Sequence, residues 1–235
     1  MNDTRAPTNG FAGFDPEAFA FLGDLKANND RQWFNARKDQ YEVLLKKPMA
    51  DLCFALADGF ELAGLPLRSD PKKSPFRIYR DTRFSNDKSP YKTHVSAYFS
   101  RDLTKGAQGG VYLHLEPGRC FVGGAHYHPD PKQLTALRTA LVEETSGFEA
   151  VVTALSDKGL TLRTDETLSR VPTAFKAHKD HPLAGYLLWK SFITGREFAD
   201  FAACDPGFAD GIIAFAQDCL PLLQWGWRAI DGIDV

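Results

Sequence analysis

The sequence predicts a single α+β domain in which N- and C-terminal helices pack on a central, mostly antiparallel sheet. Apolar residues recur at helical spacing near both ends of the chain, and four short runs between them alternate apolar and polar residues. The 235 residues are 43% hydrophobic and 25% charged, as in globular proteins that bury a sizeable core. We therefore expect a flexible tail at residues 1–13 and one domain at residues 14–235.

Three helices are predicted in the N-terminal part of the chain. Asp15 is followed by proline, which places an N-cap before proline at the first helical position. Asn29 and Asp30 are interpreted as caps of a second helix, whose apolar face begins at Trp33. Pro48 begins a third helix, and a proline-rich loop follows it.

Four strands are predicted from the alternating runs. They cover residues 76–81, 94–100, 111–117 and 120–128. Pro117 and Gly118 form a turn between the last two runs, which predicts a hairpin. Clean alternation is typical of an antiparallel sheet with one face covered.

The C-terminal part is predicted to be mainly helical. Asp130 caps a first helix, and residues 147–158 suggest a second, shorter one. Residues 160–171 are interpreted as a strand pair. A long apolar helix over residues 208–230 contains Pro221 and ends the chain.

The sequence points to a reducing compartment. The N-terminus is polar and lacks the apolar stretch of a signal peptide, and no run is long and apolar enough to span a membrane. The four cysteines are scattered among apolar residues without a C-x-x-C pair: Cys53, Cys120, Cys204 and Cys219. We expect buried, reduced thiols in a cytoplasmic protein that does not bind membranes. A pI near 6.3 argues against a protein that coats nucleic acid through its net charge.

Positive charge is concentrated in residues 72–94, which we call the basic segment. It holds seven Lys and Arg residues and two acids among interleaved aromatics, although the formal net charge of the chain is −2. The positive charges of such a cluster repel one another unless nearby negative charge neutralises them. Arginine binds carboxylate or phosphate through two parallel hydrogen bonds, so the segment predicts a site for an anion. The alternative is an internal ion-pair network with Asp30, Asp81 or Glu116 that pins the loop.

Eleven residues are predicted to form this site. The catalytic candidates are Asp81, which can also orient an arginine, and His94, which titrates near neutral pH. The ligand-binding candidates are Arg31, Arg77, Tyr79, Arg80, Arg83, Lys88, Tyr91, Lys92 and Lys190. Arg31 is included because a positive charge in the first turn opposes the helix dipole. Lys190 is included because a lysine after an apolar run can line a pocket.

Histidines on the predicted strands raise the question of a metal. His126 and His128 share one strand face, and His114 and Glu116 share another, so together they could hold zinc or iron. This spacing is common by chance, and surface or hydrogen-bonded histidines are the alternative interpretation. We therefore expect no bound metal and no cofactor.

Four segments together resemble a known microbial family. They read NNDRQWF at residues 28–34, RIYRDTRFSNDKSPYKTH at 77–94, YLHLEPG at 112–118 and YLLWKSF at 186–192. The chain resembles the family known as domain of unknown function 2461 over roughly residues 14 to 230. The resemblance implies a single domain and marks residues 77–94 as the family's signature. It implies no activity.

These observations favour a cleft that binds an anionic small molecule, most simply one that carries phosphate. An enzyme of this kind would carry out phosphoester or phosphoryl chemistry, with Arg and Lys stabilising the charge that develops. A second hypothesis is a nucleic-acid or protein interaction module in which the basic segment lies on phosphates. A third is a structural scaffold whose charges neutralise one another. No G-x-G-x-x-G, P-loop, G-x-S-x-G or H-E-x-x-H motif is present.

Overall fold

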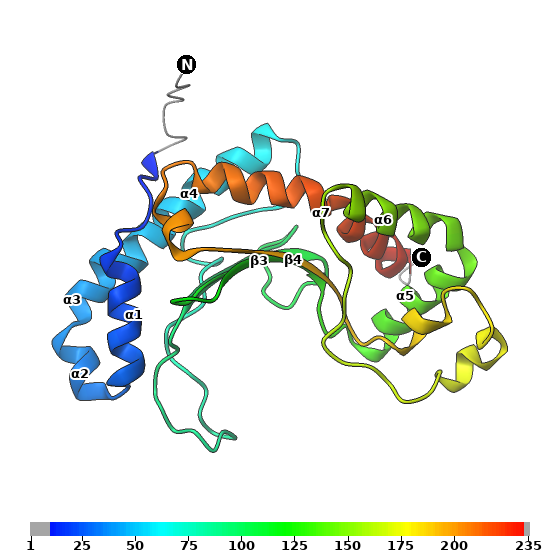
Figure 1. The fold of residues 1–235 in the computed structure, drawn as a ribbon, viewed down its shortest axis with the longest axis horizontal. Coiled ribbons are helices and arrows are strands. Elements are labelled where there is room, and N and C mark those ends of the chain that lie inside the picture. The colour runs from blue at the N-terminus through cyan, green and yellow to red at the C-terminus, as the bar shows by residue number, and fades with distance from the viewer. Residues whose placement is uncertain (1–9, 233–235) are drawn as a thin grey trace. The chain divides into compact units, whose positions relative to one another are not determined.

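Residues 10–232 are described by a computed structural model of the chain (Figure 1). They form seven α-helices and a four-stranded antiparallel sheet, which confirms the predicted α+β fold class. The residues group into two compact units. Unit 1 comprises residues up to 105, 112–122 and 197–214, and unit 2 comprises residues 106–111, 123–196 and 215 onward. Most of the predicted tail lies outside the described residues, and Phe11 at its end is already buried.

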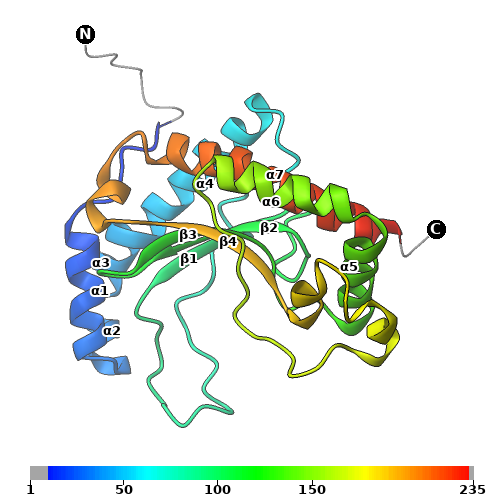
Figure 2. The same ribbon diagram turned by 45° about the vertical axis from the view of Figure 1, so that its right-hand side comes forward.

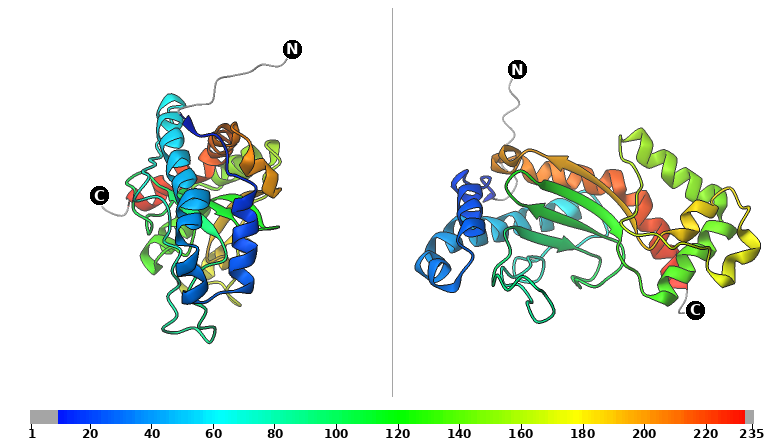
Figure 3. Two further views of the ribbon diagram at one scale, coloured as in Figure 1. Left: turned by 90° about the vertical axis from the view of Figure 1, so that its left-hand side faces the viewer. Right: turned by 60° about the horizontal axis from the view of Figure 1, so that its bottom comes forward.

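The strands follow one another in the sheet in the order of the sequence. They are β1 (Val95–Phe99), β2 (Gly110–Leu115), β3 (Cys120–His126) and β4 (Phe192–Phe198), side by side as Figure 3 shows. The first three confirm the strands predicted at 94–100, 111–117 and 120–128. The fourth was missed, because glycine and two charged residues interrupt its apolar pattern.

The strand predicted at residues 76–81 is wrong. The backbone there pairs only at isolated bridges, Pro75 with Ala97 and Tyr79 with Tyr91. Pro90 lies opposite Arg80 and accepts its N–H at 2.9 Å, but proline has no N–H to donate in return, so no regular ladder forms there. The basic segment is therefore an irregular hairpin beside β1, and its loop extends away from the sheet (Figure 2).

Unit 1 contains the N-terminal helices. They are α1 (Glu17–Ala27), α2 (Arg31–Ala36), α3 (Lys38–Tyr41) and α4 (Lys47–Leu62), with a π-helical turn at Glu42–Lys46. Asp30 caps α2 as predicted, since its carboxylate accepts the N–H of Trp33 at 2.8 Å. The predicted second helix is broken at Arg37, whose backbone leaves the helical region and whose guanidinium carbon lies 4.6 Å from the centre of the Trp33 ring. The side chain of Phe21 on α1 packs against Trp33 and Tyr41.

Unit 2 contains α5 (Pro131–Glu143) and α6 (Thr145–Asp157). The last helix, α7 (Phe208–Asp231), begins in unit 1, continues in unit 2 and contains Pro221. Asp130 forms the predicted cap of α5 through a capping box with Gln133. Phe148 and Phe192 pack on Trp225, with ring centres 4.8 and 5.3 Å apart, and form the aromatic centre of this unit.

The strand pair predicted at residues 160–171 is wrong. Only single bridges form there, between Arg163 and Ile193 and between Thr167 and Trp189. Short 3₁₀ helices cover Thr173–His178, Ala184–Leu188 and Asp200–Cys204. None of the helices within residues 10–232 is both long and apolar enough to cross a membrane.

The four cysteines are free, and they give a first test of the packing. Burial raises the pKa of Cys53, Cys120 and Cys219 to about 12, and it also raises the pKa of the half-buried Cys204. A thiol with a pKa of 12 is ionised in roughly one molecule in 10⁴ at pH 8, and the thiolate is the reactive form. We expect a thiol reagent to label the native protein slowly at pH 8 and all four thiols at once in denaturant. Rapid labelling of two or more thiols in the native protein would contradict this packing.

Candidate functional site

The basic segment is held in place by the side chain of Asn29, between α1 and α2. The Asn29 amide nitrogen donates to the carbonyl oxygen of Tyr91 at 3.0 Å, and its oxygen accepts the Tyr91 N–H at 3.0 Å. The Tyr91 ring is buried and stacks on Phe34 with ring centres 4.1 Å apart. One amide thus takes the place of a neighbouring strand, and it fixes Lys92 and the residues after it beside α1. Only a capping role was predicted for Asn29, but Asp30 provides the cap.

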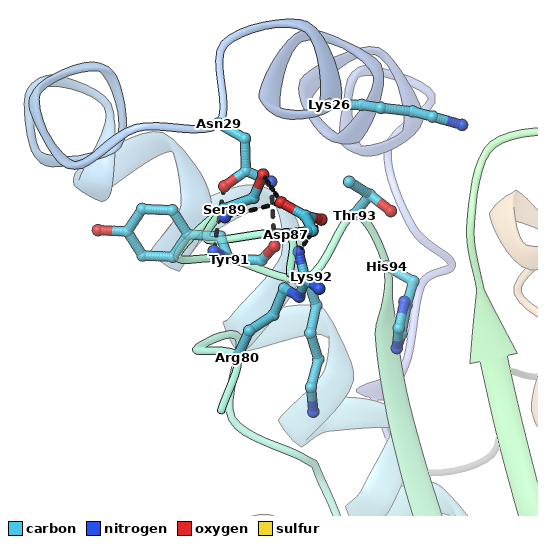
Figure 4. A pocket seen from close by; sticks show the side chains of 9 residues that line it. All are labelled: Lys26, Asn29, Arg80, Asp87, Ser89, Tyr91, Lys92, Thr93 and His94. Carbon is cyan, nitrogen blue, oxygen red and sulfur yellow. Dashed lines mark hydrogen bonds and ion pairs between the residues drawn. The ribbon is translucent and has the colours of Figure 1, made fainter. Parts of the chain in front are cut away.

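A cavity of about 390 Å³ lies in unit 1 between the end of α1 and the basic segment (Figure 4). Its lining residues are Lys26, Asn29, Arg80, Asp87, Ser89, Tyr91, Lys92, Thr93 and His94. Four of the predicted site residues are therefore brought together here: Arg80, Tyr91, Lys92 and His94. In Figure 4, Lys92 and His94 extend the same way, as residues two apart in an extended segment do.

One of the cavity's positive charges is neutralised within the cavity wall. Arg80 forms an ion pair with Asp87, whose carboxylate also accepts the N–H and the hydroxyl of Ser89 at 2.9 and 2.6 Å. The Ser89 donors and the Arg80 guanidinium hold the pKa of Asp87 well below its usual range. Lys26 and Lys92, in contrast, have no carboxylate partner among residues 10–232. The cavity wall is therefore net positive.

A second lysine, Lys105, lies with Lys92 over the ring of Phe76. The Lys92 and Lys105 amino groups lie 5.1 and 4.7 Å from the centre of this ring. Burial, followed by repulsion from Lys105 and Arg77, lowers the pKa of Lys92. Lys105 also donates to the carbonyl oxygen of Pro75 at 2.6 Å. An aromatic face compensates a cation only in part, so an anion would relieve the repulsion among these groups.

His94 also belongs to a cluster with His114 and Glu116. The two imidazole rings have centres 4.2 Å apart, and His114 Nε2 lies 3.3 Å from Glu116 Oε2. The Thr93 hydroxyl donates to Glu116 Oε1 at 3.0 Å, and Phe121 stacks on the His114 ring. β1 and β2 are adjacent in the sheet, which explains how residues from the two strands meet.

Burial sets the protonation of this cluster. It lowers the pKa of His94 to about 4, with added repulsion from His114 and Lys92, and it also lowers the pKa of His114. Burial acts to raise the pKa of Glu116, but the Thr93 hydroxyl and His114 outweigh it, and the net shift is downward. At pH 7 the cluster therefore has two neutral imidazoles and one carboxylate.

The other predicted site residues do not line the cavity. Arg83 binds Asp81 through two hydrogen bonds of 3.0 and 2.7 Å on the exposed loop, and Lys88 donates to the Thr82 carbonyl at 2.9 Å. Arg31, Arg77 and Tyr79 are exposed outside it. Lys190 lies in unit 2, where its amino group is 2.6 Å from Glu166. The internal ion-pair network is thus present in part, and the ligand-binding roles of these residues remain predictions.

The two histidines that were grouped with His114 and Glu116 have other partners. His126 Nε2 lies 3.2 Å from the Leu223 carbonyl oxygen, and His128 Nε2 lies 2.9 Å from Asp165 Oδ2. The cluster contains His94 instead. His94 precedes β1 and His114 lies on β2, so no local spacing in the sequence indicates this cluster.

Comparison with known families gives one match. Residues 17–225 match the family described as "Conserved hypothetical protein (DUF2461)". The chain belongs to this family. Neither the curated proteins nor the solved structures gave a match. The function of this DUF2461 member must therefore be argued from its site.

The Asn29 contact can be tested by mutation. We expect Asn29→Ala to lower the free energy of unfolding by about 2 kcal/mol, because the Tyr91 N–H and carbonyl lose their partners in a part-buried place. Asn28→Ala is the matched control, since Asn28 is exposed and donates only to the Asp24 carbonyl, and it should cost less than about 0.5 kcal/mol. Urea denaturation measures both values. Equal costs for the two variants would show that Asn29 does not hold the basic segment.

Proposed function

We propose that the unit 1 cavity binds an anionic small molecule that carries phosphate. The observation that carries the proposal is the charge of Lys92, which is half-buried in the cavity wall and has no carboxylate partner among the described residues. Removing such a charge from water costs free energy unless an anion pairs with it. Lys26, an exposed residue of the cavity wall, adds a second cation that has no carboxylate partner among residues 10–232, and Arg80 keeps N–H donors beyond those bound to Asp87.

Size and wall chemistry favour a small ligand over a polymer inside the cavity. Its volume of about 390 Å³ lies in the range of small-molecule sites. Lysine binds phosphate as a point charge, and the neutral His94 imidazole supplies a hydrogen bond. If the ligand is turned over, phosphoester or phosphoryl chemistry fits these groups. Lys92 would stabilise developing charge and the His94 imidazole would accept a proton.

The free cysteines support a cytoplasmic location for this activity, where thiols stay reduced and phosphorylated metabolites are abundant. Asp81, the other catalytic candidate, lies outside the cavity and is bound by Arg83. His94 is therefore the proton-transfer candidate of the proposal.

Titration calorimetry with inorganic pyrophosphate in the presence of a chelator tests the proposal. We expect one site per chain and a higher melting temperature on binding, because a ligand of the native state stabilises it by mass action. Lys92→Ala should weaken binding roughly tenfold or more, since it removes a charge-assisted contact. Lys73→Ala is the matched control, because Lys73 is an exposed lysine of the basic segment outside the cavity. A wild-type protein that binds neither pyrophosphate nor a nucleotide would leave the structural scaffold as the better account.

A second candidate function rests on the loop of the basic segment. Phe84 is 95% exposed and Tyr79 51% exposed, and Arg83 lies beside the Phe84 ring. Exposed aromatics among cations are what single-stranded nucleic acid stacks on. A nucleic-acid site would bind an oligonucleotide with a steep salt dependence, and Phe84→Ala would weaken it. Pyrophosphate binding that is lost in Lys92→Ala, with no oligonucleotide binding, favours the cavity.

A further inference from the structure

We propose that His94, His114 and Glu116 form a binding site for one divalent transition metal ion of the zinc or iron class. Each residue offers one ligand atom, and these atoms lie within 4.8 Å of one another. Two imidazoles and one carboxylate are a donor set that such ions prefer, and three protein ligands leave coordination positions open. This inference reverses the expectation of no metal from the sequence, and it replaces His126 and His128 by His94.

The spacing of two of the ligand atoms already suits a metal. Tetrahedral zinc binds nitrogen and oxygen at about 2.0–2.1 Å, which places neighbouring ligand atoms roughly 3.3 Å apart. His114 Nε2 and Glu116 Oε2 are 3.3 Å apart. For His94, no hydrogen bond of the ring nitrogens is found among residues 10–232, so its ring can turn toward the other two without breaking a hydrogen bond.

His114 and Glu116 have neighbours of the kind that orient the ligands of metal sites. The Tyr112 hydroxyl lies 3.2 Å from His114 Nδ1, on the far side of the ring from Glu116. The Thr93 hydroxyl binds Glu116 Oε1 and leaves Oε2 toward the cluster. Phe121 stacks on His114 and fixes its ring plane. Partners of this kind set the tautomer and orientation of metal-binding side chains.

A structural network explains only part of the cluster. The contact between His114 and Glu116 can be a hydrogen bond by itself. It leaves unexplained why the half-buried imidazole of His94 lies against another imidazole and has no hydrogen-bond partner within residues 10–232. The nearby positive charges of Lys92 and Arg119, the latter 3.9 Å from Glu116, act against a cation and will limit its affinity.

His94 lines the cavity as well as the cluster, so a metal ion bound by His94 would lie beside the proposed anion site, and His94 would then act as a ligand and not as a proton acceptor. This step rests on the proposed function: an anion in the cavity would offset the charges of Lys92 and Arg119 and supply a further oxygen ligand. The metal site itself does not depend on it. Its test therefore uses metal alone, without phosphate.

The experiment is a titration of the chelator-treated full chain with Co²⁺, followed by visible absorption, and with Zn²⁺, followed by calorimetry. We expect one ion per chain. His94→Ala and Glu116→Gln should each lower the affinity at least about tenfold, as loss of a ligand does. His128→Ala is the matched control, because His128 is also a histidine within hydrogen-bond distance of a carboxylate but, among residues 10–232, belongs to no group of three possible metal ligands. The control should bind as the wild type does.

Two results would overturn the metal site: no stoichiometric binding by the wild type, or equal affinity in the wild type and His94→Ala. Circular dichroism and melting curves identify any variant that fails to fold. His94 is the safest position, because within the part of the chain that the structure describes its side chain makes no hydrogen bond that a substitution would break. Pyrophosphate binding in chelator, combined with no metal binding, would remove the metal and leave the proposed function intact. Metal binding without pyrophosphate binding would leave the metal site intact and contradict the proposed anion site.

Discussion

The paired hydrogen bonds between the Asn29 side chain and the Tyr91 backbone are the contact on which the site depends. The basic segment has no regular ladder to hold it, because it meets its neighbours only at isolated bridges. The Asn29 amide provides the missing partner, and the stack of Tyr91 on Phe34 buries the same residue. With Tyr91 fixed, Lys92, Thr93 and His94 have fixed positions at the start of β1. The cavity and the histidine cluster both follow from those positions.

The charged side chains of the basic segment lie partly on its outer loop and partly in the cavity wall. On the outer loop, Arg83 and Asp81 neutralise each other in water, where such pairs contribute little to stability. In the cavity wall, Arg80 and Asp87 do the same, but Lys92 has no carboxylate partner in the described part of the chain. The sequence showed the concentration of charge and could not show this division. Which arginines are neutralised locally is decided by loop geometry, since Asp81 and Asp87 each reach one guanidinium.

The parts of the fold that local pattern determines were predictable from the sequence. The caps at Asp30 and Asp130 and the alternating strands β1 to β3 are set by residues close together in the chain. The features that were not predicted depend on contacts between residues far apart in the sequence, or on interruptions of the alternating pattern. β4 lacks clean alternation, and residues 76–81 have strand-like alternation but follow a proline that pairs only at single points. Asn29 meets Tyr91 across 62 residues, and His94 meets His114 across two strands, so no local spacing reveals either contact.

We propose that the residues fixed by Asn29 form a site for an anion beside a metal. A crystal structure of the full chain soaked with pyrophosphate and Co²⁺, with anomalous data at the cobalt edge, tests it most directly. The account predicts pyrophosphate density in contact with Lys92 and an anomalous peak among His94, His114 and Glu116. Empty density in the cavity, with cobalt only at another place such as His128 and Asp165, would contradict it.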